Sequence, residues 1–218
     1  MNIAIDGPAG AGKSTIAKLV AKELGNIYVD TGAMYRAIGL HVLRSGIDPA
    51  NEELLEAAAD KADVTIRHIG DEQHVILNGE DVNGLIRNEK VSQMASIVSA
   101  NGAIRRKLVR LQQAMAKETA VVMDGRDIGT VVLPDADVKV YLTASSRVRA
   151  ERRMKDYLGK GQECPPMEEL IREIEERDER DMTREESPLR QAEDAVLIDS
   201  SDMTIDEVVG AILKLADR

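Results

Sequence analysis

Short apolar runs alternate along the chain with longer segments in which apolar residues recur at helical spacing. The runs are bounded by glycines or acidic residues, which is typical of buried strands. The predicted strands are residues 2–6, 27–29, 120–124, 138–142 and 196–199. The predicted helices are residues 14–24, 32–43, 88–117, 147–184 and 204–216, with breaks near 101–102 and 159–166. Apolar strands that alternate with helices predict an α/β fold, in which a five-stranded, mostly parallel sheet carries helices on both faces.

The pattern changes after Asp63. Residues 64–69 and 75–77 are rich in β-branched residues, and the sequence Gly70-Asp71 between them is typical of a turn. These features predict a β-hairpin. Because the hairpin interrupts the alternation of strands and helices, we interpret residues 63–84 as an insertion over the main sheet.

Composition narrows the classes of partner. Hydrophobic residues make up 43% of the chain, but there are four Tyr, no Phe and no Trp. The core must therefore be aliphatic, and no row of aromatic rings is available to stack successive bases. A net charge of −10 repels a nucleic-acid backbone, so we discount DNA and RNA polymers as partners. Local arginine clusters, such as the one at residues 147–153, suit a small anion better.

Cysteine content and hydropathy indicate the compartment. The single cysteine, Cys164, excludes an internal disulfide and favours a reducing environment. No apolar run approaches the ~20 residues of a membrane span, and the first residues lack the pattern of a secretion signal. We therefore expect a cytoplasmic protein, a monomer, with no membrane partner.

Residues 7–14 match the eight-residue Walker A pattern in full, between a predicted strand and a predicted helix. Its glycines let backbone N–H groups point at phosphate oxygens, and the helix presents its positive end to the same anion. Lys13 is expected to reach the outer phosphates of ATP, and Ser14 to bind magnesium. The predicted ATP-binding residues are Gly7, Pro8, Ala9, Gly10, Ala11, Gly12, Lys13, Ser14 and Thr15.

Polar residues follow two other predicted strands. Asp124 ends the strand 120–124, where a P-loop protein holds magnesium through water, and Arg126 is placed to clamp a phosphate with its guanidinium group. Arg36 lies in the first turn of the helix after the second strand, near the edge of the sheet where ligands gather. The alternative is that Arg36 is a surface arginine and Tyr35 a core residue.

A third arginine group lies on the last long helix. Arg177, Arg180 and Arg184 are spaced i, i+3 and i+7, so they share one helix face with Asp178 and Asp181. A solvated, salt-bridged face is the simpler interpretation, and we favour it for Arg180. For Arg184 that interpretation and a phosphate-binding role compete evenly.

The chain resembles the bacterial cytidylate kinase family over essentially its whole length. The resemblance rests on residues 7–14, 30–36, 124–132 and 177–181, which together are far more specific than a P-loop. It implies a nucleoside-monophosphate kinase core, an acceptor-binding domain with an extra β insertion, and a mobile lid. The implied division is a core of residues 1–30, 102–152 and 167–218, an acceptor domain of residues 31–101, and a lid of residues 153–166.

The resemblance also implies a reaction and a set of roles. The protein would move the γ-phosphoryl group of ATP to CMP and dCMP with magnesium, and Lys13, Arg126, Arg184 and a lid arginine, Arg153, would act in catalysis. Arg36, Arg126 and Arg184 would hold the acceptor phosphate. Cytosine would be read by Ser96, Arg105 and Asp127, and the ribose by Arg177 and Asp181. The full set implied for CMP is Thr31, Tyr35, Arg36, Ser96, Arg105, Arg126, Asp127, Arg177, Asp181 and Arg184, with Ser14 and Asp124 for the metal.

Two alternatives remain at this point. One is another small P-loop kinase, and the charged acceptor residues argue against a neutral acceptor for it. The other is a nucleotide-binding regulatory module. Guanine-nucleotide switches need an Asn-Lys-x-Asp segment, which does not occur in these 218 residues. We therefore rank the regulatory module low.

Overall fold

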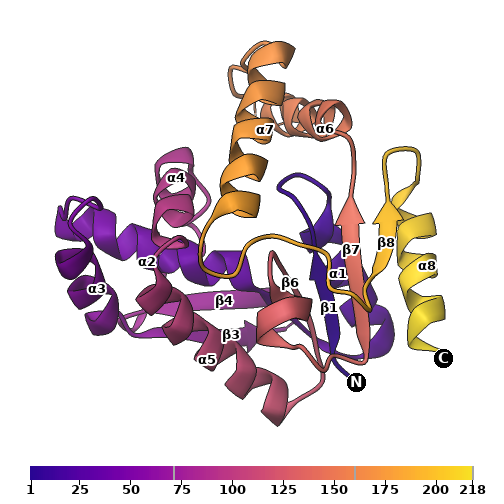
Figure 1. The fold of residues 1–218 in the computed structure, drawn as a ribbon, viewed down its shortest axis with the longest axis horizontal. Coiled ribbons are helices and arrows are strands. Elements are labelled where there is room, and N and C mark those ends of the chain that lie inside the picture. Colours follow the sequence, from indigo (N-terminus) through magenta and orange to yellow (C-terminus); the bar gives the residue numbers. More distant parts are fainter. Residues whose placement is uncertain (71, 160, 218) are drawn as a thin grey trace. The chain divides into compact units, whose positions relative to one another are not determined.

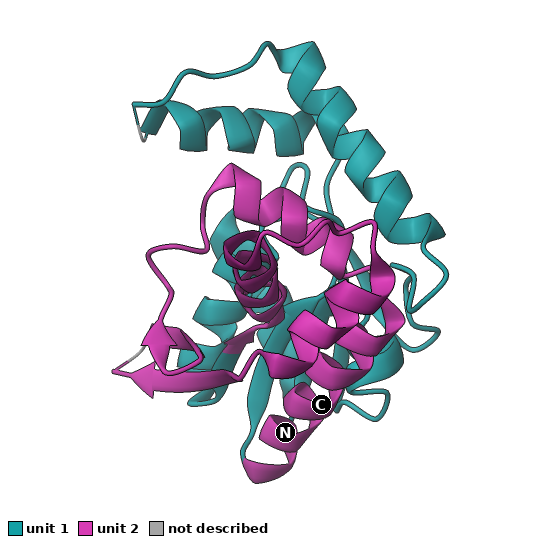
Figure 2. Ribbon diagram, turned by 90° about the vertical axis from the view of Figure 1, so that its left-hand side faces the viewer, with its two compact units in different colours: residues 1–28, 119–218 teal, residues 29–118 magenta. Residues whose placement is uncertain are grey.

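The computed structural model describes residues 1–70, 72–159 and 161–217. Figure 2 shows that the chain divides into two compact units. Unit 1 consists of residues 1–28 and 119–218, and unit 2 of residues 29–118. Asp71, which forms half of the predicted turn, and Lys160, which belongs to the predicted lid, lie outside the described residues.

The main sheet has five strands in the order β2-β6-β1-β7-β8 (Figure 1). The described neighbours pair in parallel: β1 pairs with β6 and β7, and β7 pairs with β8. The predicted fold class is therefore confirmed. The central strand β1 is buried at every position, which explains why it is apolar throughout. The strands are β1 (Ile3–Asp6), β2 (Ile27–Asp30), β6 (Val121–Gly125), β7 (Val138–Thr143) and β8 (Val196–Asp199).

Helices of unit 1 pack on this sheet and on one another. The aliphatic core joins Ile16 and Val20 of α1 to Val208 and Ile212 of α8, and Ile5 of β1 belongs to the same cluster. A second, small cluster joins α6 to α7. A five-residue π-helical turn, η1 (Ile128–Val132), follows β6 and was not predicted. The helices are α1 (Lys13–Leu24), α6 (Ser146–Gly159), α7 (Met167–Thr183) and α8 (Ile205–Ala216).

Unit 2 contains the predicted hairpin. Strand β3 (Val64–Ile69) pairs antiparallel with β4 (Glu72–Leu77), with Val64 opposite Leu77. The structure adds a short third strand, β5 (Glu80–Asp81), beside β4. The described residues of the unit also form four helices, and one of them, α3, was not predicted. They are α2 (Thr31–Ser45), α3 (Glu52–Lys61), α4 (Glu89–Val98) and α5 (Gly102–Glu118).

Helix α5 lies in compact unit 2, and the predicted core domain of residues 1–30, 102–152 and 167–218 stays a prediction. Ile104 and Leu108 of α5 are fully buried in the hydrophobic cluster of unit 2. Lys107 adds a polar tie, because its ammonium group donates to the carbonyls of Ala59 (2.7 Å) and Ala62 (2.8 Å) at the end of α3. Helix ends leave such carbonyls without partners inside the helix. The boundary therefore follows packing that the helical pattern alone does not reveal.

Among the residues that the structure describes, no helix is long and apolar enough to cross a membrane.

Candidate active site

The P-loop needs glycine at two positions for different reasons. Gly7 has φ 147°, and a Cβ atom there would lie 1.9 Å from the carbonyl oxygen of Leu142 in the neighbouring strand β7. Gly12 has φ 92°, in the left-handed region, and is the residue from which α1 begins. L-residues with side chains rarely adopt either conformation. The loop can therefore stay close to the sheet while α1 starts at Lys13.

Lys13 is buried at the start of α1, and its ammonium group donates to the carbonyl of Pro8 over 2.7 Å. Burial, the largest cause, and the positive charge of Arg126 together lower the pKa of Lys13 to about 7, against the opposing effect of Asp124 and Asp6. The nearby carboxylates therefore do not fully compensate the cost of burying the positive charge of Lys13. The phosphates of a bound nucleotide would supply the missing negative charge.

Asp124, at the end of β6, is held by two hydroxyl groups. Ser14 Oγ donates to Asp124 Oδ2 over 2.9 Å, and the Tyr28 hydroxyl donates to Oδ1 over 2.8 Å. The two residues predicted for the metal are therefore in direct contact. Both offer hard oxygen ligands, which is the chemistry that Mg²⁺ prefers. No group of three or more His, Cys, Asp or Glu side chains suited to a metal occurs in the described part of the chain.

Asp6 is the last residue of β1, and its side chain binds the segment that follows β6. Its carboxylate accepts hydrogen bonds from the backbone N–H groups of Ile128 (2.8 Å) and Gly129 (2.7 Å). The pKa of Asp6 is raised to about 6, mainly by burial, because the two N–H groups and Lys13 only partly offset this effect. Asp6 thereby fixes the start of the π-helical turn, immediately after Asp127.

The predicted acceptor residues of unit 1 form one network. Arg126 Nε donates to Asp181 Oδ2 over 2.8 Å. Arg184 lies between two carboxylates, 3.8 Å from Asp127 Oδ1 and 4.0 Å from Asp181 Oδ1, and also donates to the carbonyl of Ser187. Burial tends to raise the pKa of Asp181, but the positive charges of Arg126, Arg177 and Arg184 hold it below its ordinary value. The structure therefore brings these arginines and acids together.

The face of α7 that carries this network is not a solvated one. Asp178 and Asp181 are buried, whereas Arg180 is exposed, as expected for a solvent-facing residue. Arg177 is half-buried. Arg153, the predicted lid arginine, is partly exposed and lies 3.3 Å from Glu173 of α7.

In unit 2, Arg36 turns toward the start of its own helix. Its guanidinium lies 3.5 Å from the carboxylate of Asp30, which also accepts from the backbone N–H of Ala33 and so caps α2. Arg87 contacts the same carboxylate at 3.2 Å. Two cations thus converge on one buried acid. Thr31, also predicted, is buried in the first turn of α2.

Arg105 and Ser96 are linked through Ser99. The Arg105 guanidinium donates to the carbonyl of Ser99 over 3.1 Å, and the Ser99 hydroxyl donates to the carbonyl of Ser96 over 2.8 Å. Arg105 also lies 5.4 Å from the centre of the Tyr35 ring, within range of a cation–π contact. The structure therefore brings three predicted acceptor residues of unit 2 into one group: Tyr35, Ser96 and Arg105.

A sequence model of the cytidylate kinase family matches residues 3–218. The chain belongs to the cytidylate kinase family. A protein named cytidylate kinase from Caldicellulosiruptor saccharolyticus is 54% identical over 215 residues, which cover 99% of this chain and 95% of the relative. One of the same name from Bacillus pumilus is 49% identical, over 100% of this chain and 96% of its own length.

Solved structures support the fold of this cytidylate kinase family member. A shikimate kinase from Bacteroides thetaiotaomicron has a TM-score of 0.53 and covers 100% of this chain and 99% of its own. The two sequences are 14% identical, so this likeness concerns the fold alone.

Sequence reasoning missed four residues that position the family's motifs in this chain. Asp6 binds the segment that follows β6, and Tyr28 binds Asp124 near the end of β6. The signal for Asp6 was its place at the end of a predicted strand, and Tyr28, inside the strand 27–29, gave none. Arg149 and Arg152 were noticed merely as part of a basic cluster. Both donate to backbone carbonyls of the P-loop, Arg149 to Ala9 and Arg152 to Ala11.

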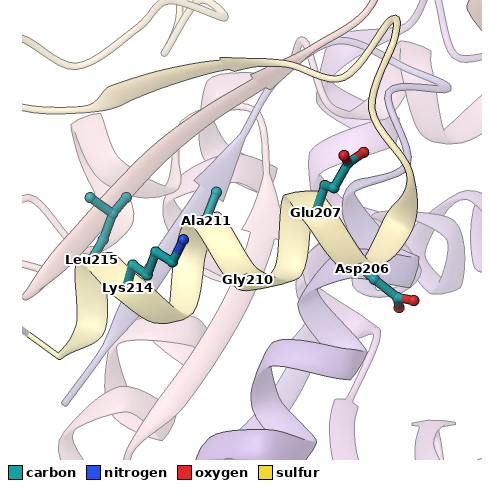
Figure 3. Close-up of a pocket in the computed structure, with 6 residues that line it drawn as sticks. All are labelled: Asp206, Glu207, Gly210, Ala211, Lys214 and Leu215. Carbon is teal, nitrogen blue, oxygen red and sulfur yellow. The ribbon is translucent and has the colours of Figure 1, made fainter.

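A hollow is lined by residues of α8 (Figure 3). None of the predicted site residues is among the described residues that line it, and its lining has no phosphate-binding loop. We assign it no role in catalysis. The lining residues are Asp206, Glu207, Gly210, Ala211, Lys214 and Leu215.

Proposed function

We propose that this protein transfers the γ-phosphoryl group of ATP to the phosphate of CMP, and also of dCMP, and releases ADP with CDP or dCDP. The family match over residues 3–218 carries the proposal. The full-length relatives named cytidylate kinase support it. The paired arginines and acids of the site also support a charged acceptor over a neutral one.

On the donor side, the P-loop (residues 7–15) would bind the phosphates of ATP, and Lys13 would exchange its bond to Pro8 for the outer phosphates. The contact between Ser14 and Asp124 supports a magnesium site at this point, with Asp124 acting through water. When bound, magnesium would neutralise charge on the β- and γ-phosphates. Tyr28 would keep the carboxylate of Asp124 in place.

Residues proposed for the acceptor occur in both units, and each unit is considered by itself. In unit 1, Arg126 and Arg184 would bind the phosphate of CMP, Asp127 the cytosine amino group, and Arg177 and Asp181 the ribose. Cytosine offers an amino donor where uracil offers an acceptor, so a carboxylate at this point would discriminate between them. In unit 2, Arg36 would bind the phosphate, Ser96 and Arg105 the base, and Thr31 and Tyr35 would complete the set.

The reaction needs alignment and charge stabilisation more than acid–base chemistry. An oxygen of the CMP phosphate attacks the γ-phosphorus of ATP in line, and the bond from that phosphorus to the β–γ bridging oxygen breaks. The charge spread over the transferred group would be met by Lys13, Arg126 and Arg184. Arg153 would join them when the proposed lid, residues 153–166, closes and excludes water.

A coupled assay for ADP formation tests the proposal. The purified protein is mixed with ATP, magnesium and one acceptor at a time: CMP, dCMP, UMP, AMP or shikimate. Fast ADP release with CMP and dCMP, and much slower release with the other acceptors, is expected. Comparable rates with shikimate would favour another small kinase. ATP binding without ADP release in any mixture would favour the regulatory module.

A further inference from the structure

Two arginines of α6 donate hydrogen bonds to backbone carbonyls of the P-loop. Arg149 Nη1 donates to the carbonyl of Ala9 over 3.0 Å, and Arg152 Nη1 donates to the carbonyl of Ala11 over 3.2 Å. Gly10 lies between these two carbonyls, and a Cβ atom there would come within 3.3 Å of Arg149 Cβ. The loop and the helix are therefore in close contact at this point.

The direction of these hydrogen bonds matters for phosphate binding. A P-loop binds phosphate with backbone N–H groups that face the anion, and the carbonyls of the same peptides point the other way. Buried carbonyls need donors of their own. Cationic donors supply this need and form stronger hydrogen bonds than neutral ones. Holding the carbonyls of Ala9 and Ala11 thus orients the N–H groups of the loop.

Arg149 is itself fully engaged. Its Nε donates to the carbonyl of Ala144 over 2.9 Å, and its Nη2 lies 2.6 Å from Asp178 Oδ2 of α7. All three nitrogens therefore have partners, and the side chains of both Arg149 and Asp178 are buried. Arg152 is tied in a similar way to the hydroxyl and the carbonyl of Ser200.

We infer that Arg149 and Arg152 are positioning residues for the donor nucleotide, which hold the P-loop carbonyls so that its N–H groups face the phosphates, and that Asp178 fixes Arg149 for this purpose. The inference rests on the proposed function in taking ATP as the ligand of the loop. By this inference, α7 supports the ATP-binding loop through Asp178 and also bears Asp181 of the proposed acceptor site.

Asp178→Asn provides the sharpest test, because two explanations predict opposite signs. If charge alone mattered, removal of a negative charge near the nucleotide would strengthen the binding of ATP. If Asp178 positions Arg149, its loss weakens the hold on Ala9, and the Kd for ATP rises. We expect a rise of about fivefold or more, the difference between a charged and a neutral hydrogen bond. The measurement is calorimetric titration with magnesium and a non-hydrolysable ATP analogue.

Two further variants address the arginines. Arg149→Lys keeps the charge but cannot reproduce the planar fork. Arg152→Gln removes the cationic donor to Ala11 and leaves the longer bond from the Ser200 hydroxyl (3.5 Å). Both should raise the Kd for the analogue at least threefold or so while the Kd for CMP changes less than about twofold. The matched controls are Arg147→Gln on α6 and Arg172→Gln on α7, whose side chains are 76% and 69% exposed. Neither control should change either Kd.

Each outcome decides the matter. Unchanged or tighter binding of the analogue in a folded Asp178→Asn protein overturns the role of Asp178. If the affinities for the analogue and for CMP fall equally, or if the loss of affinity follows a fall in Tm, the contacts only stabilise the fold. If Asp178→Asn does not fold, the two arginine variants still give the answer. The proposed function is tested separately, because wild-type protein that binds the analogue but does not phosphorylate CMP refutes the function and leaves this inference standing.

Discussion

Replacing Asp181 by asparagine keeps the size of the side chain and one oxygen but removes its negative charge. In the structure this carboxylate accepts from Arg126 Nε over 2.8 Å and lies 4.0 Å from Arg184. It is 6% exposed, so water cannot replace the lost charge easily. The substitution therefore acts on the orientation of Arg126 as well as on any ribose that Asp181 binds.

Two contributions set the size of the effect. Hydrogen bonds to charged groups contribute about 1.5–3 kcal/mol and neutral ones about 0.5–1.5 kcal/mol, so the weaker bond to Arg126 should lose about 1–2 kcal/mol. That corresponds to a fall of about 5–30-fold in kcat/KM for CMP and dCMP alike. A ribose hydroxyl that donates to the carboxylate adds a loss for CMP that dCMP, which has one hydroxyl fewer, does not suffer in full. The ratio of kcat/KM for CMP to kcat/KM for dCMP should therefore fall.

The assay measures kcat/KM for both acceptors in wild type, Asp181→Asn and the control Glu179→Gln, which removes a negative charge from an exposed position of the same helix. A shared loss with an unchanged ratio would assign Asp181 to Arg126 alone. Unchanged rates for both acceptors would refute the reasoning.

Acid stability gives a second readout for the same variant. The arginines hold the pKa of Asp181 below its ordinary value of 3.8, so the carboxylate stabilises the fold above that pH. This contribution is lost as pH falls through the lowered pKa. The stability difference between wild type and Asp181→Asn should therefore shrink in acid.

Three other substitutions test separate parts of the structure. Lys13→Ala should abolish ADP formation with CMP. The Tm should stay near that of wild type, because burial disfavours the charged form of Lys13 and its removal therefore costs little stability. Near-normal turnover would remove Lys13 from the donor site. Asp127→Ala should weaken CMP binding by about 1–3 kcal/mol and ATP binding far less in titrations of each nucleotide, and equal losses would end its base-reading role. Lys107→Met should lower the free energy of unfolding in urea by about 1–3 kcal/mol by leaving carbonyls at the end of α3 without a donor, whereas the exposed control Lys90→Met should not.

The central strands of the main sheet could be predicted because they are buried on both faces. Such strands are continuous apolar runs, and β1 and β6 are both of this kind. Helix α3 escaped prediction because its pattern is weak, with Leu55 as the one large apolar residue beside Ala58 and Ala59 among its buried positions. The π-helical turn after Asp127 has no periodic pattern in five residues. It depends on Asp6, which is more than a hundred residues away in the sequence.

The site was predictable where a motif has a mechanism of its own. The spacing of the Walker A glycines and Ser14 is enough to predict that they bind phosphate and magnesium. The partners of the arginines were not predictable, because a guanidinium can reach a phosphate, a carboxylate or a backbone carbonyl from the same helix. Arg149 and Arg153 illustrate this, since one is buried against Ala9 and the other pairs with Glu173 near the surface. Spacing along a helix indicates a shared face but not what that face contacts.

Each cation proposed to meet phosphate in unit 1 already has a partner in this structure. Lys13 donates to Pro8, Arg126 to Asp181, and Arg184 to Ser187. A buried charge without a partner costs several kcal/mol, so a chain of net charge −10 must hold these groups in place before any nucleotide arrives. For a contact that is given up when phosphate binds, such as Lys13 with Pro8, the free energy of binding is the difference between two sets of contacts. The loss expected for Asp181→Asn therefore requires that Asp181 keeps its bond to Arg126 Nε and orients this guanidinium while the other nitrogens of Arg126 meet phosphate; if the bond were given up instead, removing the carboxylate would strengthen the binding of the anion.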